Sequence, residues 1–267
     1  MPEVDTPREV KYLDPRVAII RHRVEHVGNV VAIASGKGGV GKTTLATLSA
    51  LVLSKRGLRV GLLDLDFNCP ACHIVLGAQD AKPREEYGLV PPKVYGVEFM
   101  SIAMFVGDKE VPMRGVDIVN AMIEILAITR WSKLDLLLID LPPGTSDEVL
   151  EVARLLKHKL KTILVTTPSR LSIAGVRKLW EVLKKLNVPT LGLVINMVRN
   201  INEIKAVEEE VRKWGIENVA TLPYDSELEN AIGSPDKLLN TEVAREIRRF
   251  WDKVLEVMMA PQQRTPG

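Results

Sequence analysis

The 267-residue sequence predicts a single α/β domain with a mostly parallel β-sheet covered by helices on both faces. Three observations predict this class. Short runs rich in Val, Leu and Ile alternate with longer segments of helical periodicity, as in right-handed strand–helix–strand units. No linker rich in Pro, Gly or Ser interrupts that alternation. The composition, 46% apolar and 26% charged, suffices for a large buried core.

The alternation begins at Asn29, where a short apolar run to Ala34 suits a buried parallel strand. A glycine cluster follows, and an apolar segment of helical length then runs from Thr44 to Arg56, ending at Gly57, a natural C′ residue. The further expected strands are 59–63, 97–105, 134–139, 162–166, 191–195 and 219–222. The further expected helices are 116–131, 146–157, 173–186, 203–214 and 241–259.

The domain boundaries follow from the two ends of this alternation. Residues 1–28 carry three prolines and no clear period, which indicates an N-terminal extension or a short lead-in helix. The α/β domain itself is expected to span 29–259, and residues 260–267 are expected to form a C-terminal tail. The stretch 79–96, rich in proline, predicts a surface excursion between two strands.

Charge and hydropathy exclude several classes of protein. The 36 basic and 34 acidic residues nearly cancel, so there is no strong signal for nucleic-acid binding. No signal-peptide core precedes the first strand, and no apolar run reaches the ~18 residues of a membrane span. Two cysteines are too few for a disulfide scaffold. We therefore expect a cytoplasmic protein for which membrane contact is disfavoured.

A phosphate-binding loop is the strongest motif. The segment 36–43 satisfies G-x-x-x-x-G-K-[ST] between an expected strand and an expected helix. Its glycines let backbone N–H groups converge on phosphate oxygens, and the positive end of the following helix faces the same anion. Lys42 is expected to reach the β- and γ-phosphates of ATP, and the Thr43 hydroxyl to ligate Mg²⁺. The predicted ATP-binding residues of this loop are Gly36, Lys37, Gly38, Gly39, Val40, Gly41, Lys42, Thr43 and Thr44.

Hydrolysis of ATP needs further groups, and the strand ends provide candidates. Asp140 ends an apolar strand at the edge where open α/β sheets bind ligands, and it is expected to hold Mg²⁺ directly or through water. Gly144 follows two prolines and can turn its N–H toward the γ-phosphate as a sensing switch. Asp64 and Asp66 follow another strand, and one of them can orient the attacking water. A helix cap is the alternative for Asp66.

Together these residues resemble the deviant Walker A ATPases, the group that contains MinD, ParA and the nitrogenase iron protein. The group's loop, K-G-G-V-G-K-[ST], is found here as residues 37–43. The resemblance implies an ATP-sandwich homodimer in which Lys37 crosses to the partner's phosphates as an arginine-finger-like charge, a solvated loop lysine being the alternative. It also implies that Asp66 positions the water and that Asn196 and Pro223 lie where the group holds adenine.

Within that group, residues 138–148 are similar to the D-x-P-P-G-T-x-D-E segment of the Mrp-type proteins, which carry iron–sulfur clusters for delivery. The resemblance covers about residues 24–255. Mrp-type proteins usually carry C-P-x-C late in the chain, and this sequence has no cysteine there. Instead Cys69-Pro70-Ala71-Cys72 lies just beyond Asp66, so the cluster site is either moved or lost.

The cysteine pair allows three interpretations. Cys69 and Cys72 can give two thiolates to a metal or cluster, and a cluster bridging a symmetric dimer would then receive four. Alternatively, the pair can undergo thioredoxin-like redox chemistry, or it can simply pack beneath a loop. His73 beside the pair is either a further ligand or, as for most isolated histidines, a surface or capping residue.

Two functions remain open at the level of sequence. The first is a homodimeric ATP hydrolase whose cycle gates the loading of an iron–sulfur cluster and its release to client proteins. The second is a ParA- or MinD-type ATPase that positions DNA or membrane-bound partners. The apolar stripe of helix 241–259 can lie on a membrane as in MinD-like proteins, but packing on the sheet is favoured. A metabolic phosphotransfer enzyme would need a second substrate domain.

Overall fold

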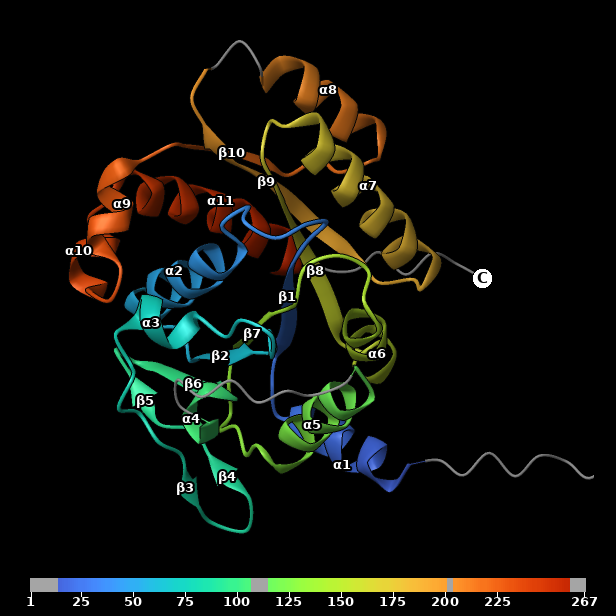
Figure 1. Ribbon diagram of the computed structural model, residues 1–267, viewed down its shortest axis with the longest axis vertical. Helices are drawn as coiled ribbons and strands as arrows, with labels where there is room; N and C mark the ends of the chain where they lie inside the picture. The colour runs from blue at the N-terminus through green and yellow to red at the C-terminus, as the bar shows by residue number, and fades with distance from the viewer. Residues whose placement is uncertain (1–13, 107–114, 201–203, 260–267) are drawn as a thin grey trace, which may run out of the picture.

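One eight-stranded sheet forms the centre of the computed structural model, which describes residues 14–106, 115–200 and 204–259 (Figure 1). Its strands are β1 (Asn29–Ser35), β2 (Val60–Asp64), β5 (Lys93–Val94), β6 (Val97–Ser101), β7 (Leu136–Asp140), β8 (Leu160–Thr166), β9 (Thr190–Val198) and β10 (Val219–Pro223). They lie in the order β10-β9-β8-β1-β7-β2-β6-β5. Every neighbouring pair is parallel except β5 and β6. The predicted fold class is confirmed.

Helices cover both faces of this sheet (Figure 1). They are α1 (Pro15–Glu25), α2 (Lys42–Lys55), α3 (Cys72–Leu76), α4 (Ala103–Val106), α5 (Gly115–Ile128), α6 (Asp147–Leu155), α7 (Arg170–Lys185), α8 (Ile204–Lys213), α9 (Ser226–Ala231), α10 (Pro235–Leu239) and α11 (Glu242–Met259). One core contains side chains of α1, α5, α6, α7 and α8. The other contains side chains of α2, α3, α10 and α11.

Strand β1 shows how one sequence serves two cores. Val30, Ala32 and Ala34 belong to the first core, whereas Val31 and Ile33 belong to the second. All five are buried because successive side chains of a strand point to opposite faces of a sheet. This requirement explains why the central strands read as continuous apolar runs rather than as alternating ones.

The expected strand 97–105 is wrong in its second half. Strand β6 stops at Ser101, which pairs with Asp64, the last residue of the neighbouring β2. Within the described residues, neither β2 nor β5 pairs with the chain beyond Ser101, and the Ser101 hydroxyl accepts a hydrogen bond from the backbone N–H of Ala103. The chain turns there into α4, because this local bond offers the backbone an alternative to the sheet.

The segments outside the main alternation contribute to the frame. Ile20 and Val24 of α1 are buried in the first core, so this helix packs on the domain as a lead-in helix. The excursion 79–96 contains β5 and a small hairpin of β3 (Arg84–Glu85) and β4 (Leu89–Val90). Predictions for residues 1–13 and 260–267 fall outside the described residues.

The apolar stripe of α11 packs against the rest of the domain. Phe250, Trp251 and Val254 are buried in the second core, where α11 lies against α2 and β10. Among the described helices, none is long and apolar enough to cross a membrane.

Candidate nucleotide-binding site

The strand order brings three loops to one edge of the sheet. Strands β1 and β2 flank β7, and the register pairs Asp140 of β7 with Ile33 and with Asp64. The carboxyl ends of the three strands therefore lie side by side, where ligands of open α/β sheets bind. The loop after β1 is the glycine-rich segment, and the loop after β2 carries Asp66 and the cysteine pair.

The glycine-rich loop has the backbone that the motif requires. Gly39 and Gly41 have φ angles of +76° and +84°, in the left-handed region that favours glycine. Gly41 is also the N-cap of α2, and its position has no side-chain cap, so the first amides of the helix remain available to an anion. A Cβ atom on Gly36 would lie 2.0 Å from the backbone carbonyl carbon of Gly175 in α7.

Lys42, Thr43 and Asp140 form the centre of the site. Asp140 Oδ1 accepts from Lys42 Nζ at 2.7 Å, and Asp140 Oδ2 accepts from Thr43 Oγ1 at 2.7 Å. The Lys42 and Asp140 side chains are only 7% and 0% exposed. Burial alone would lower the pKa of Lys42, but the negative charges of Asp140 and Asp66 outweigh it and raise that pKa. The lysine is therefore fully charged and neutralises a buried carboxylate.

Asp64 and Asp66 differ in their surroundings. Asp66 lines the pocket, and its Oδ2 lies 3.8 Å from Lys42 Nζ. The Asp64 carboxylate is fully buried and accepts from the backbone N–H groups of Asp66 and Cys72 and from the Ser101 hydroxyl. Burial and the charge of Asp140 raise the pKa of Asp64 to about 7. Asp66 is thus the carboxylate that faces the pocket, whereas Asp64 braces its loop.

A pocket of about 530 Å³ opens in front of these groups. The pocket also contains Glu148, which was not predicted as a site residue although it ends the 138–148 segment. Glu148 is 8% exposed and sits in the first turn of α6, where a helix dipole favours a carboxylate. The lining residues are Ser35, Lys37, Gly38, Gly39, Val40, Gly41, Lys42, Thr43, Thr44, Asp66, Asn68, Cys69, Ala71, Pro142, Pro143, Ser146 and Glu148.

Gly144, the predicted phosphate sensor, lies in the loop that follows β7. Its φ is +86°, and its N–H donates to the Ser35 carbonyl at 2.8 Å. Gly144 is not among the residues that line the pocket. In this conformation its amide is engaged with β1, so contact with a phosphate would require that hydrogen bond to break.

A second, smaller pocket of about 120 Å³ adjoins the first. Gly41 and Thr44 line both, while Asn196 and Pro223 line the smaller one. Asn196 Nδ2 donates to the Val40 carbonyl at 2.9 Å, which ties the end of β9 to the glycine-rich loop. The structure therefore brings both residues predicted for adenine next to the loop predicted for the phosphates.

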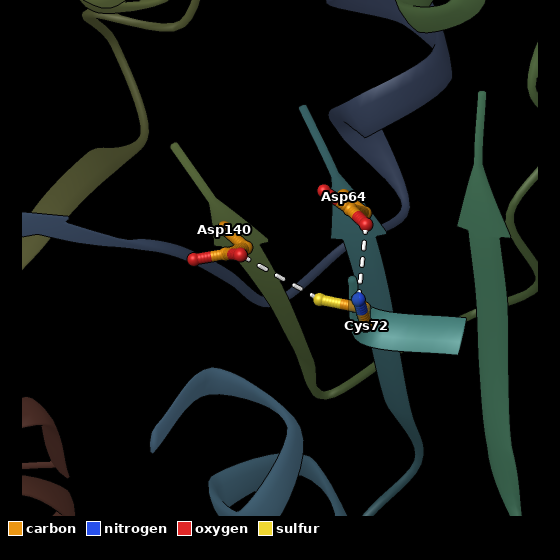
Figure 2. Close-up of side chains that lie close together, drawn as sticks. All are labelled: Asp64, Cys72 and Asp140. Carbon is orange, nitrogen blue, oxygen red and sulfur yellow. Dashed lines mark hydrogen bonds between the residues drawn. The ribbon is translucent and has the colours of Figure 1, made fainter. Parts of the chain in front are cut away.

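The two cysteines lie in different environments. Cys69 is exposed on the pocket wall, and its backbone N–H donates to Asp66 at 3.2 Å. Cys72 begins α3 and is fully buried (Figure 2). Its Sγ lies 3.6 Å from Asp140 Oδ2, and its backbone N–H donates to Asp64 Oδ2 at 3.2 Å. Burial, followed by the charges of Asp64 and Asp140, raises the pKa of the Cys72 thiol.

This arrangement of β1, a glycine-rich loop and α2, with Asp140 against the loop lysine and threonine, defines a P-loop nucleoside triphosphatase. The chain belongs to the NUBPL iron-transfer P-loop NTPase family of the ParA group, whose family model matches residues 26–258. The predicted relationship to deviant Walker A ATPases is therefore confirmed.

Named relatives agree with this membership. The iron-sulfur cluster carrier protein of Pseudomonas fragi is 38% identical over 218 residues, which cover 76% of this chain and 75% of that protein. The iron-sulfur cluster carrier protein of Methanocaldococcus jannaschii is 31% identical over 266 residues, covering 94% and 92%.

Solved structures extend the comparison to three dimensions. A nucleotide-binding protein of Archaeoglobus fulgidus, solved in complex with ADP and with cobalt found by PIXE, is 31% identical with a TM-score of 0.73 and coverages of 86% and 96%. The cell-division ATPase MinD of Pyrococcus furiosus has a TM-score of 0.65 at 20% identity, with coverages of 86% and 99%, and shares the fold.

Proposed function

We propose that the protein is a homodimeric switch that slowly hydrolyses Mg-ATP and uses this cycle to bind and deliver iron–sulfur clusters in the cytoplasm. The observation that carries the nucleotide part is the contact of Lys42 and Thr43, which line the pocket, with the buried Asp140 carboxylate. The cluster part is supported by relatives that are named as carriers and by the family's iron-transfer description.

Thr43 and Asp140 fit a magnesium ion. The Thr43 hydroxyl and the Asp140 carboxylate are the hard oxygen ligands that Mg²⁺ prefers, and their oxygens lie 2.7 Å apart at the mouth of the glycine-rich loop. Thr43 and Asp140 would hold the ion, directly or through water. When bound, it would neutralise negative charge on the ATP phosphates.

Nucleotide binding would exchange one partner of Lys42 for another. In the structure, Lys42 forms a buried ion pair with Asp140. The phosphates of ATP offer Lys42 stronger partners, while the loop amides and the start of α2 receive the remaining charge. Asp66, on the pocket wall, would orient the attacking water. The exposed Lys37 would reach the phosphates of the partner subunit, where it would stabilise charge in the transition state.

Cys69 and Cys72 are the proposed ligands of the cargo. Cys69 is exposed on the pocket wall, near the surface at which the second protomer would dock. Cys72 would have to leave its buried position before both thiols of one chain could hold the same cluster. A nucleotide-driven movement of the loop between β2 and α3 would provide that exposure and couple ATP to loading.

Anaerobic reconstitution with iron and sulfide tests this function. We expect acid-labile sulfide and iron to remain with the full-length protein after desalting, and to be lost in Cys69→Ser. On the same samples, the protein should turn over ATP, and addition of nucleotide should shift its mass from that of the monomer to that of the dimer. If wild-type protein retains no more iron than the Cys69→Ser, Cys72→Ser double variant, the cargo assignment is wrong. ATP-dependent cosedimentation with DNA or liposomes would favour the positioning function instead.

A further inference from the structure

Two polar side chains at the start of α6 lie on the wall of the nucleotide pocket without partners. Glu148 lines the pocket, is only 8% exposed, and takes part in no hydrogen bond or ion pair within the described residues. Ser146 lines the same pocket, and its buried hydroxyl also has no partner in the described part of the chain. Buried polar groups normally have partners, because an unsatisfied group loses its bonds to water without replacement. Their shared position therefore indicates a hydrogen-bonding group that binds there.

The start of the helix does not by itself explain these two side chains. Ser146 is the N-cap of α6, where a serine hydroxyl usually accepts from a backbone amide of the first turn, yet its side chain makes no such bond. The helix dipole favours a carboxylate in this turn, but Asp147 provides one at the surface. The burial of Glu148 against the pocket thus requires a further partner.

The charges around the pocket indicate that this partner is a cation. The pocket is proposed to hold the phosphates of ATP, and a carboxylate on its wall would repel them unless a positive charge lies between. Lys37 and Lys42 are the cations that line the pocket within the described residues. Lys42 pairs with Asp140 at 2.7 Å and is proposed to move to the phosphates of the ATP bound by its own chain. Lys37 remains, because it is exposed and has no ion pair in the described chain.

A symmetric dimer supplies such a lysine from the second copy. Lys37 and Glu148 line the same pocket of one chain but form no ion pair with each other. In a twofold interface, a contact between two residues occurs twice, once in each direction. If Lys37 enters the second copy's pocket, as the proposed function requires, the partner's Lys37 enters this one. The cation and the carboxylate of each chain then form reciprocal pairs.

We infer that Glu148 accepts a hydrogen bond from the ammonium group of the partner's Lys37 and holds that group against the transferred phosphate, with the Ser146 hydroxyl beside it. This inference rests on the proposed function and makes Glu148 a positioning residue, since it acts through the lysine. A lysine has a flexible four-carbon stem and three N–H donors, so it benefits from a fixed acceptor and can still bond phosphate oxygens. Without Glu148, the lysine would reach the pocket but occupy the productive geometry less often.

Single-turnover hydrolysis by the full-length protein at saturating ATP and Mg²⁺ tests this role. Glu148→Gln keeps the shape of the side chain and removes its charge, so turnover should fall by about 10–100-fold while ATP affinity and dimer mass stay constant. The matched control is Asp147→Asn, which removes a charge from the same helix turn at the surface and should leave turnover within about twofold of wild type. In a Lys37→Ala background, Glu148→Gln should cost no more than about a further twofold, because the group that it positions is absent.

Mixed dimers show which lysine Glu148 holds. In a 1:1 mixture of Lys37→Ala and Glu148→Gln proteins, about half of the dimers combine the two chains, and each of these has one site with both Glu148 and the partner's Lys37. Turnover should therefore rise to about one quarter of the wild-type value. Turnover that does not exceed the mean of the two separate proteins would assign Glu148 to the lysine of its own chain and overturn the inference.

The outcomes separate this inference from the proposed function. Circular dichroism checks the fold, and Glu148→Ala replaces Glu148→Gln if the latter does not fold. If Lys37→Ala loses turnover but the Glu148 variant does not, the positioning role is wrong and the ATP switch stands. An equal loss with and without Lys37 also overturns the inference, because Glu148 would then act on something other than the lysine. Unaltered turnover in Lys37→Ala contradicts the proposed function itself.

Discussion

Lys42 carries two roles that only the structure joins. It is the lysine that the motif assigns to the phosphates, and it is also the partner of the buried Asp140 carboxylate at 2.7 Å. A buried ion pair is seldom kept for stability alone, because burying both charges offsets much of their attraction. In the proposed function, the pair is a resting arrangement that ATP would disrupt.

Replacement of Lys42 by Ala should therefore have two effects. ATP binding should weaken by at least tenfold, which is about 1.4 kcal/mol, because a charge-assisted contact to the phosphates is lost. The free energy of unfolding should fall by about 3–5 kcal/mol, because Asp140 is left buried without its cation. Calorimetry and urea unfolding measure the two effects. Unchanged ATP affinity in a folded Lys42→Ala protein would refute the assigned role.

Replacement of Lys37 by Ala should lower turnover but, unlike Lys42→Ala, should change neither stability nor ATP affinity by much. Lys37 is exposed, and it makes no ion pair within the part of the chain that the structure describes, so Lys37→Ala should change stability by at most about 0.5 kcal/mol. ATP affinity should also stay nearly constant. Turnover should fall by about 10³-fold or more if the lysine acts on the partner's phosphates as an arginine finger does. Single-turnover hydrolysis at saturating ATP measures this, and an unaltered rate would mean that Lys37 is merely a solvated lysine.

At the scale of elements, the contact between the P-loop and α7 constrains the site. Gly36 approaches Gly175 so closely that an added Cβ would meet backbone, which cannot move aside as a flexible side chain can. By contrast, the nearest atom to a Cβ on Gly38 is Pro143 Cγ at 4.0 Å. Glycine at position 36, the first of the motif, therefore allows α7 to pack against the loop, whatever its contact with phosphate.

Thermal unfolding of two alanine variants without nucleotide tests this difference. Gly36→Ala should destabilise the protein by about 1–3 kcal/mol or more, because the chain must shift to relieve the overlap. Gly38→Ala should leave the free energy of unfolding within about 1 kcal/mol of wild type. Equal losses in both variants would show that the close approach to α7 is not what fixes glycine at position 36.

Helix α11 provides a second test at this scale. Trp251 is fully buried against the second core, whereas Met259 is 75% exposed. Trp251→Ala should cost about 3–5 kcal/mol in urea unfolding, and Met259→Ala at most about 0.5 kcal/mol. Liposome binding, measured in parallel, should be negligible for wild type. Strong binding that Met259→Ala abolishes would indicate that the helix end serves a membrane.

At the scale of the whole molecule, local patterns predicted most of the frame. The apolar run at Asn29 and the glycines after it predicted a buried strand that leads into a P-loop, as the structure has it. Periodicity also located the long helices to within a few residues. The short elements α9, α10 and β3 were not predicted, because two to six residues contain too little periodicity to show a preference.

The site was harder to predict than the fold. Its motif residues were identifiable because each has a fixed spacing, but burial depends on contacts between distant segments. The inward position of Cys72 and the outward position of Cys69 follow from where α3 begins, which their spacing does not encode. Glu148 likewise enters the pocket only because α6 starts beside the glycine-rich loop. The bond between Gly144 and Ser35 is a property of this conformation.

Isothermal titration calorimetry of the full-length protein with ATP and Mg²⁺ tests the central claim most directly. The geometry of Lys42, Thr43 and Asp140 predicts saturable binding of one nucleotide per chain, weakened when a chelator removes Mg²⁺. A folded protein that gives no heat and no saturation with ATP and Mg²⁺ at several temperatures would contradict the account from the P-loop outward.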